Sequence, residues 1–264
     1  MSGALQAVFQ NQRSFVAAPG QNQYTVCGSY SWVAPTGITK VSIVTIGKGG
    51  CGGNGYRGPG LGGGGGGGGG LAYKNCVTVS PGTSYPFVVG NTTTALGLTA
   101  NKGGNGVAGP TGTGGLGGTS SGGTVNYTGG AGKDSAAAFP PCAYWGGAGG
   151  GSAGYTGNGL VGTGVTTGGN SGDGNLGGTS AGRGAGGGGG TSLISSATAV
   201  PKPEDRNQQG GPGACSGGGG GGGPGGNDYI PFGGAVIGGC NGRGGIRVLW
   251  GPGRAYPNTN TGNV

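Results

Sequence analysis

The sequence lacks histidine altogether, and only 7% of its 264 residues are charged. Histidine is the usual general base at neutral pH and the commonest metal ligand, so its absence removes both roles. The five acids are isolated apart from one adjacent pair beside prolines; they are Asp134, Asp173, Glu204, Asp205 and Asp228. We interpret the segment that contains Asp173 as a tight turn, because it lacks the further carboxylates of a calcium loop. The sequence therefore predicts a protein that is not an enzyme, with no catalytic residues and no cofactor.

Closely spaced cysteines are also lacking. The chain has six, none of them in a Cys-x-x-Cys pair: Cys27, Cys51, Cys76, Cys142, Cys215 and Cys240. Zinc sites need such paired ligands, so we predict no metal site. Spacing alone cannot choose among disulfide pairings, and free thiols acting as small buried hydrophobes are the favoured interpretation.

Long hydrophobic runs are missing as well. No stretch approaches the roughly 18 apolar residues of a membrane-spanning helix, so we predict no membrane insertion. Residues 1–6 do not combine a basic start with an apolar stretch, which argues against a signal peptide.

The net charge of +8 comes from Lys and Arg residues scattered along the chain. A surface that follows phosphates would need them clustered, so no nucleic-acid partner is expected. Arg57, Arg183 and Arg243 each precede a glycine. This leaves a disordered glycine-rich nucleic-acid-binding protein as an alternative reading.

Glycine dominates what is present, at 83 residues, with unbroken runs at 62–70 and 217–223. Apolar residues make up 31%, below the roughly 45–50% of ordinary domains, so one large core is excluded. Disorder is one interpretation of such a composition. Disordered chains usually carry many charges, however, and this sparsely charged chain could instead pack its own backbone.

Segments rich in β-branched and aromatic residues separate the glycine runs. They predict strands at 24–27, 29–33 and 40–46, the last of them well buried. Between the second and third, Gly37 would supply the positive φ of a turn.

A further pair of strands is predicted at 71–79 and 85–89. Pro81-Gly82 between them suits the centre of a type II turn, so the sequence predicts a β-hairpin. Pro86 cannot donate to a neighbouring strand and indicates an edge or a bulge.

The last predicted strand, 245–250, lies far along the chain. Ile246, Val248 and Trp250 would share one face of it. A strand this late must return to the sheet that the chain left earlier. We predict a mainly β fold, in which a small antiparallel β-sandwich is closed by N- and C-terminal strands.

The glycine-rich regions do not have the strict Gly-X-Y period of collagen, and only 15 prolines are present. We predict inserted bundles of extended polyproline-II-type (polyglycine II) helices, in which a nine-glycine run would span about 28 Å. The expected organisation is an attachment arm at 1–20, a β-sandwich module at 21–102 and 240–264 with a glycine excursion at 49–70, and a glycine-rich helix bundle with variable loops at 103–239.

Three stretches, at 31–44, 69–90 and 244–254, resemble the glycine-rich domain of virion and tail-fibre proteins of tailed bacteriophages, including T4-like marine phages. They contain Ser31-Trp32-Val33-Ala34-Pro35, Leu71-Ala72-Tyr73-Lys74-Asn75 and Ile246-Arg247-Val248-Leu249-Trp250. The resemblance implies a virion structural protein that is made in the host cytoplasm. Its partners would be other virion proteins and further copies of itself.

The alternation of glycine runs with other segments is similar in organisation to the fibre-tip adhesins of T-even phages. In that family, glycine helices form a scaffold and loops contact the host receptor. The corresponding loops here would be 125–145, 193–209 and 229–237. The implied function is a tail-fibre component or adhesin that presents loops to the host surface; a capsid decoration or fibre-shaft protein without receptor activity is the alternative.

Aromatic residues between the glycine runs are the candidate contacts with a receptor or partner. At exposed loop tips, such rings could stack on sugars or anchor a protein. Equally, they could cap the ends of the bundle or fill a subunit interface. The candidates are Tyr127, Phe139, Tyr144, Trp145, Tyr155, Tyr229 and Phe232.

Overall fold

A computed structural model describes residues 17–55, 62–110, 112–138, 143–164, 167–173 and 242–258. All regular secondary structure within these ranges is β, which confirms the predicted mainly β class. None of the described residues forms a helix that could cross a membrane. The predicted attachment arm lies outside the described residues as far as position 16.

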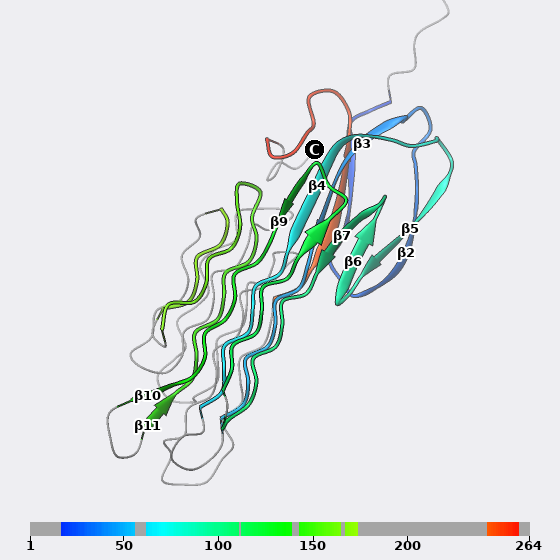
Figure 1. The fold of residues 1–264 in the computed structure, drawn as a ribbon. Helices are drawn as coiled ribbons and strands as arrows, with labels where there is room; N and C mark the ends of the chain where they lie inside the picture. Colours follow the sequence, from blue (N-terminus) through cyan, green and yellow to red (C-terminus); the bar gives the residue numbers. More distant parts are fainter. Residues whose placement is uncertain are drawn as a thin grey trace, which may run out of the picture.

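The first sheet has five antiparallel strands in the order β1-β12-β3-β4-β9 (Figure 1). β12 pairs with β1 on one side and with β3 on the other, although β3 is separated from it by most of the chain. The late strand predicted at 245–250 therefore lies inside the sheet. The strands are β1 (Gly20–Tyr24), β3 (Lys40–Ile46), β4 (Leu71–Thr78), β9 (Val125–Tyr127) and β12 (Gly245–Trp250).

The second sheet also has five antiparallel strands, in the order β2-β5-β6-β7-β8. Its outermost strand β8 contributes only two residues, which pair with β7. The strands are β2 (Gly28–Val33), β5 (Ser84–Val89), β6 (Thr92–Ala95), β7 (Leu98–Asn101) and β8 (Ser120–Ser121).

One apolar cluster joins the two sheets. Trp32 and Phe87 from the second sheet stack with their ring centroids 5.7 Å apart, and both belong to the same buried cluster as Ile43, Ile246 and Val248 from the first. The other face of the first sheet carries a second cluster, which includes Leu249. The period-two alternation predicted for β12 is thus confirmed, since the consecutive residues Val248 and Leu249 belong to different clusters on opposite faces of the sheet.

The hairpin predicted at 71–89 is wrong. β4 belongs to the first sheet and β5 to the second, so the two strands do not pair. The predicted turn itself forms, because Thr83 N donates to Ser80 O at 3.1 Å and Gly82 has a φ of 75°. Further backbone bonds tie this turn to Ala34, so it passes the chain from one sheet to the other.

Pro86 lies in an inner strand, with β2 on one side of β5 and β6 on the other. β6 pairs only with Phe87 and Val88, however, so β5 has no neighbour on that side at Pro86. At Pro86, β5 is therefore an edge strand on the β6 side, in line with the prediction. The missing N–H of proline costs no inter-strand hydrogen bond on that side. The turn predicted before β3 also forms, with Gly37 at a φ of 80°.

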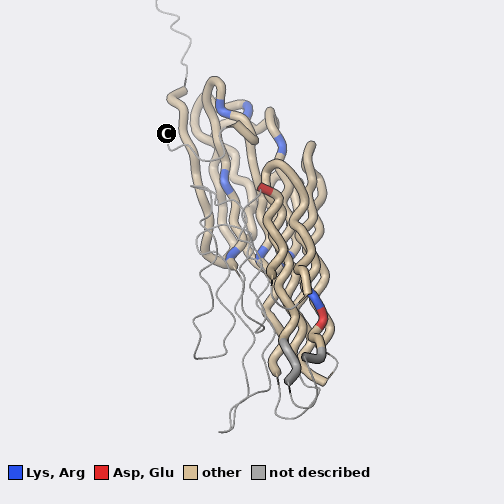
Figure 2. The backbone as a smooth tube through the Cα atoms, turned by 90° about the vertical axis from the view of Figure 1, so that its left-hand side faces the viewer, with Lys and Arg blue, Asp and Glu red and all other residues tan. Residues whose placement is uncertain are grey.

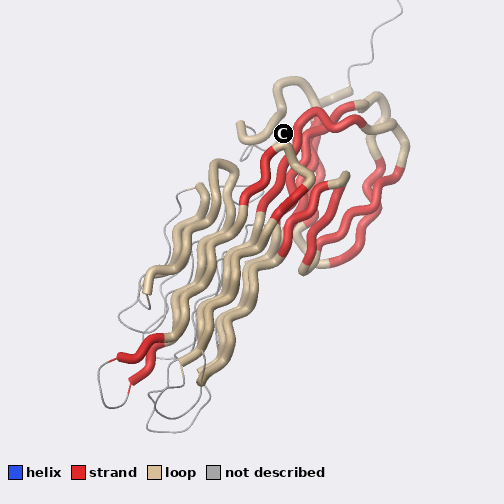
Figure 3. Tube along the Cα trace, viewed as in Figure 1, coloured by secondary structure: helices blue, strands red, loops and turns tan. Residues whose placement is uncertain are grey.

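Beyond the sheets, extended segments without strand pairing run side by side and form what we term the glycine-rich array (Figures 1 and 3). Backbone N–H···O=C bonds link neighbouring segments at every third residue: Gly47, Gly50 and Gly53 donate to Gly70, Gly67 and Gly64 in turn. The array consists of residues 47–54, 62–70, 101–109, 112–119, 128–135, 146–154, 157–164 and 167–173.

Segment 62–70 lies at the centre of the array. It bonds through its backbone to five other segments: 47–53, 101–107, 115–118, 130–133 and 147–153. The glycine excursion expected at 49–70 as part of the β module is therefore continuous with the glycine-rich region that follows. All nine of its residues are buried although none has a side chain.

The loop expected at 125–145 is several elements rather than one. Residues 125–127 form β9 in the first sheet, and residues 128–135 belong to the array. Only the part after them projects, as a hairpin of β10 (Ala136–Ala138) and β11 (Ala143–Trp145). The other expected loops, 193–209 and 229–237, lie outside the described residues.

The array predicts strong sensitivity to added side chains. A Cβ at Gly67 would collide with the backbone carbonyl of Leu116, whereas a Cβ at Gly90 would meet nothing closer than 3.6 Å. Neither residue has a positive φ, so backbone strain does not distinguish them. We expect Gly67→Ala to lower the free energy of unfolding by on the order of 3 kcal/mol, because backbone cannot yield as a flexible side chain does.

Denaturant unfolding of both variants measures this difference. Gly90→Ala is the matched control and should change stability by less than about 1 kcal/mol. Equal stability of the two variants would contradict the close backbone packing around segment 62–70.

Candidate recognition surface at the outer end of the glycine-rich array

The β10–β11 hairpin projects from the end of the array that lies farthest from the two sheets (Figure 1). Tyr144 pairs through its backbone with Ala137, and Trp145 with Ala136. The sequence-predicted pair Tyr144 and Trp145 is therefore placed at this end. Phe139, Tyr229 and Phe232 lie outside the described residues.

Backbone hydrogen bonds attach both ends of the hairpin to the array. Ser135 N donates to Gly112 O at 2.7 Å before β10, and Gly147 N donates to Gly63 O at 2.9 Å after β11. The carboxylate of Asp134 accepts a bond of 2.7 Å from Gly114 N. Two array segments, 62–70 and 112–119, thus position the hairpin, which a free loop would not achieve.

Charged side chains are sparse along the array, and most of the described Lys and Arg residues lie elsewhere (Figure 2). Near the hairpin, the exposed Lys133 and Asp134 stand next to each other in sequence and carry opposite charges. These two described charges therefore offset each other at this end of the array.

Tyr155 does not lie at an exposed loop tip, which was one of the two positions considered for it. Its side chain is 1% exposed, so it cannot contact a receptor from the surface of this structure. Its ring stacks on that of Tyr256, with centroids 5.4 Å apart and planes 7° from parallel, and Tyr73 packs beside both. Tyr127 is half-buried and packs against the same cluster. These two residues lie where the array meets the first sheet.

Burial raises the pKa of Tyr155 and of Tyr256 well above the ordinary tyrosine value of 10.0, since a charged phenolate would be poorly solvated there. The Tyr256 hydroxyl donates to the backbone oxygen of Arg247 at 3.3 Å. The Tyr155 hydroxyl is buried and has no hydrogen-bond partner among the described residues.

A buried arginine lies at this junction, and its burial was not predicted from the sequence. Arg247 is 0% exposed, and its guanidinium donates to Gln21 Oε1 from Nε at 2.9 Å and from Nη2 at 2.5 Å. Arg254 also reaches Gln21, at 3.4 Å. The signal that could have identified it is the apolar Leu249, which shares the strand face of Arg247 by period-two alternation and indicates that this face is covered as well.

Asp173 braces the end of the array near the same junction. Its Oδ1 accepts bonds from Thr156 N at 3.1 Å and from Thr156 Oγ1 at 3.2 Å. Burial raises the pKa of this carboxyl, and the hydrogen bonds from Thr156 oppose the rise. These bonds join residues 17 positions apart. Gly172 and Asp173 themselves lie in a turn, and the rest of the predicted tight turn lies outside the described residues.

Within the described ranges no three His, Cys, Asp or Glu residues gather into a group that could hold a metal. Three cysteines are described, Cys27, Cys51 and Cys76, and all are free thiols. Cys27 and Cys76 are exposed rather than buried, so the expectation of buried thiols is wrong for both.

No protein-family model matches the chain, and no curated protein matches it in sequence.

The environment of Tyr155 predicts different results for two substitutions. Tyr155→Phe removes only a hydroxyl without a partner, and we expect it to change the free energy of unfolding by less than about 1 kcal/mol. Tyr155→Ala also removes the stacked ring, and we expect a loss of about 3–5 kcal/mol. Chemical denaturation measures both; a Phe variant as unstable as the Ala variant would contradict this assignment.

The raised tyrosine pKa values predict loss of stability at alkaline pH. In the unfolded chain these phenols lose their protons near the ordinary pKa of 10.0, whereas in the folded chain they keep them. Their contribution is therefore complete below that pH and is lost as the pH rises above it. Denaturation midpoints measured from about pH 8 to pH 11 should fall at the alkaline end, and less steeply in Tyr155→Phe. Identical slopes for the two proteins would exclude Tyr155 as a source.

Proposed function

We propose that this chain is a non-enzymatic phage virion protein, a tail-fibre component or adhesin that presents the outer end of its array to the host surface. The observation that carries the proposal is the backbone hydrogen-bonded array, which holds the β10–β11 hairpin at a distance from the two sheets. The β module would attach to other virion proteins, and the hairpin would meet the receptor.

The array segments are proposed to be polyglycine II helices. Such a helix has three residues per turn and no internal hydrogen bonds, so its N–H and C=O groups point outward in directions that repeat every third residue. The spacing between neighbouring segments supports this assignment: Gly65 and Gly68 donate to 130–133, while Gly64 and Gly67 donate to 104–107. Adjacent residues thus bond to different neighbours.

The two sheets are proposed to form a β-sandwich closed by the N- and C-terminal strands. β1 and β12 are neighbours in the first sheet, and the cluster around Trp32 and Phe87 lies between the two sheets. This closure fixes the segments that continue from β3, β4, β7 and β9 into the array at their inner ends. A structure with ends fixed in this way can order glycine, which loses more backbone freedom on folding than any other residue.

Self-association is part of the proposal. Leu116 is 76% exposed, Leu160 56% and Val107 49%, and all three belong to the array. Large apolar side chains on a surface with few charges favour contact with another protein surface. A homo-oligomer or a fibre partner could cover them.

Removal of the hairpin tests the receptor role. Replacement of 136–145 by a short Gly-Ser linker leaves β9 and the array segments in place. We expect particles that carry the variant to assemble normally and to lose adsorption to host cells, because the contact residues would be absent. Adsorption is measured as the loss of free particles over time, and incorporation by electron microscopy.

Val161→Thr is the matched control, since Val161 is exposed on the array away from the hairpin and is not one of the residues proposed to be covered by a partner. It should adsorb like the parent protein. Normal adsorption by the hairpin variant would instead support a capsid decoration or fibre-shaft protein without receptor activity.

A further inference from the structure

A pocket opens on the second sheet, remote from the hairpin. β5 continues to Ser84, but β6 ends at Ala95, which pairs with Phe87. The step between the two strands leaves an open cavity of about 290 Å³ beside Tyr85 and Pro86. This volume is just below the range of roughly 300–1,000 Å³ typical of small-molecule sites.

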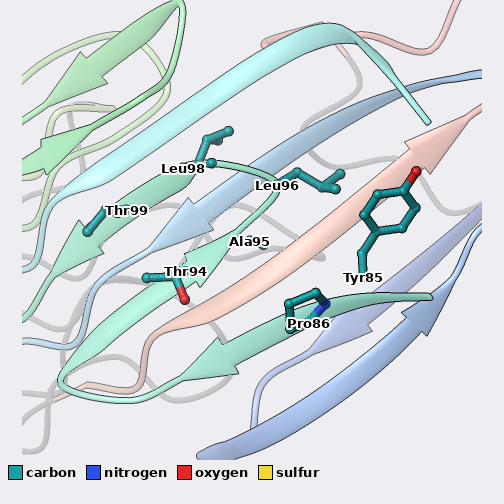
Figure 4. Close-up of a pocket in the computed structure, with 8 residues that line it drawn as sticks. Tyr85, Pro86, Thr94, Ala95, Leu96, Leu98 and Thr99 are labelled. Atoms are coloured by element: carbon teal, nitrogen blue, oxygen red, sulfur yellow. The ribbon is translucent and has the colours of Figure 1, made fainter. Parts of the chain in front are cut away.

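The walls of this pocket combine apolar and hydroxyl groups and carry no charge. Leu96 extends toward the Tyr85 ring, and Pro86 lies on the adjoining part of β5 (Figure 4). Thr94 and Thr99 are directly paired across β6 and β7, so their side chains share a face. A ligand with one apolar face and several hydroxyls would match such a lining, whereas an ionic ligand would find no counter-charge.

Tyr85 is held in place before any ligand binds. Its hydroxyl oxygen accepts a hydrogen bond of 2.8 Å from Ser80 N, and its ring lies 5.8 Å from that of Trp32. The phenolic hydrogen stays available for donation, because the bond from Ser80 uses only the oxygen. Thr94 and Thr99 also line the pocket, and their hydroxyls can both donate and accept hydrogen bonds.

The rim of the pocket contains an unusual backbone conformation. Leu96 has a φ of 46° and Gly97 a φ of 81°, so a leucine occupies the left-handed region in the two-residue turn between β6 and β7. Asn or Gly is the usual residue at such a position, and strained residues of this kind cluster at ligand sites. Leu96 therefore lines the cavity from a turn position at which hairpin stability alone would favour a small or polar residue.

Addition of a peptide strand is disfavoured here. The open side of β5 includes Pro86, which has no N–H to offer an incoming strand. An amphipathic ring compound needs no such ladder. Sugar rings present an apolar C–H face suited to Pro and Tyr rings, and hydroxyls suited to Thr.

We propose that this pocket binds one uncharged pyranose unit of a glycan. Such a site would give the β module its own carbohydrate contact, separate from the hairpin and independent of the proposed receptor role. The shared chemistry does not distinguish a bacterial surface polysaccharide from a glycan attached to protein.

Amide NMR titrations of the full chain with methyl pyranosides of glucose, galactose, mannose and N-acetylglucosamine test the proposal. We expect saturable shifts at millimolar concentrations for at least one of them, confined to residues around Tyr85, Leu96 and Thr99. The double variant Thr94→Val, Thr99→Val keeps the shape of the pocket and should weaken binding at least tenfold. Neutral oligosaccharides from bacterial polysaccharide and from glycoprotein then distinguish the two sources.

Ser121→Ala is the control, because Ser121 is exposed on the neighbouring strand and does not line the pocket. It should bind like the parent chain, and both variants should unfold at the parental temperature. The proposal is overturned if none of the four pyranosides shifts these amides, if only charged sugars or extended peptides do so, or if the double valine variant binds unchanged.

Discussion

The structure depends on backbones that approach one another closely enough to exchange hydrogen bonds on several sides at once. A Cβ on almost any glycine of segment 62–70 would meet the carbonyl of a neighbouring segment. Ordering glycine is costly in entropy, and a buried amide without a partner is also costly. In the array, backbone N–H and C=O groups of neighbouring segments bond to one another, and these bonds offset both costs. Each segment is therefore stable only in the presence of its neighbours.

The two sheets supply what the array cannot, namely a fixed starting register. Apolar burial between Trp32 and Phe87, and on the other face around Tyr155 and Tyr256, anchors the chain at the points where strands continue into array segments. The junction is therefore the one place where side-chain packing and backbone bonding meet. Its buried aromatic rings and Arg247 explain why residues that look isolated in a glycine-rich sequence are well packed in the fold.

Part of this fold could be predicted from the sequence. The strands β3 and β12 were evident because β-branched residues concentrate there, and the turns at Gly37 and Gly82 because glycine permits a positive φ. The pairing of 71–79 with 85–89 was predicted wrongly, since a turn motif specifies local geometry and not the sheet that receives the next strand. Only the long-range partners of β4 and β5, in β3 and β2, decide that question.

The candidate site was less accessible to sequence reasoning. Tyr155 follows a glycine and precedes Thr156, which is the local context of a loop, and its stacking partner Tyr256 lies in a distant segment. The pocket beside Pro86 exists only because β6 is shorter than β5, and strand ends are poorly encoded locally. By contrast, the position of Tyr144 and Trp145 on a projecting element agrees with their place between glycine runs.

The three-residue spacing of the bonds has a consequence for how such chains vary in length. Inserting three residues into an array segment advances it by one full repeat and returns every N–H to the direction of its former acceptor. Inserting one or two rotates all later donors toward the wrong neighbour. Homologous chains should therefore gain and lose residues in these segments in multiples of three, while the turns that join the segments accept any length.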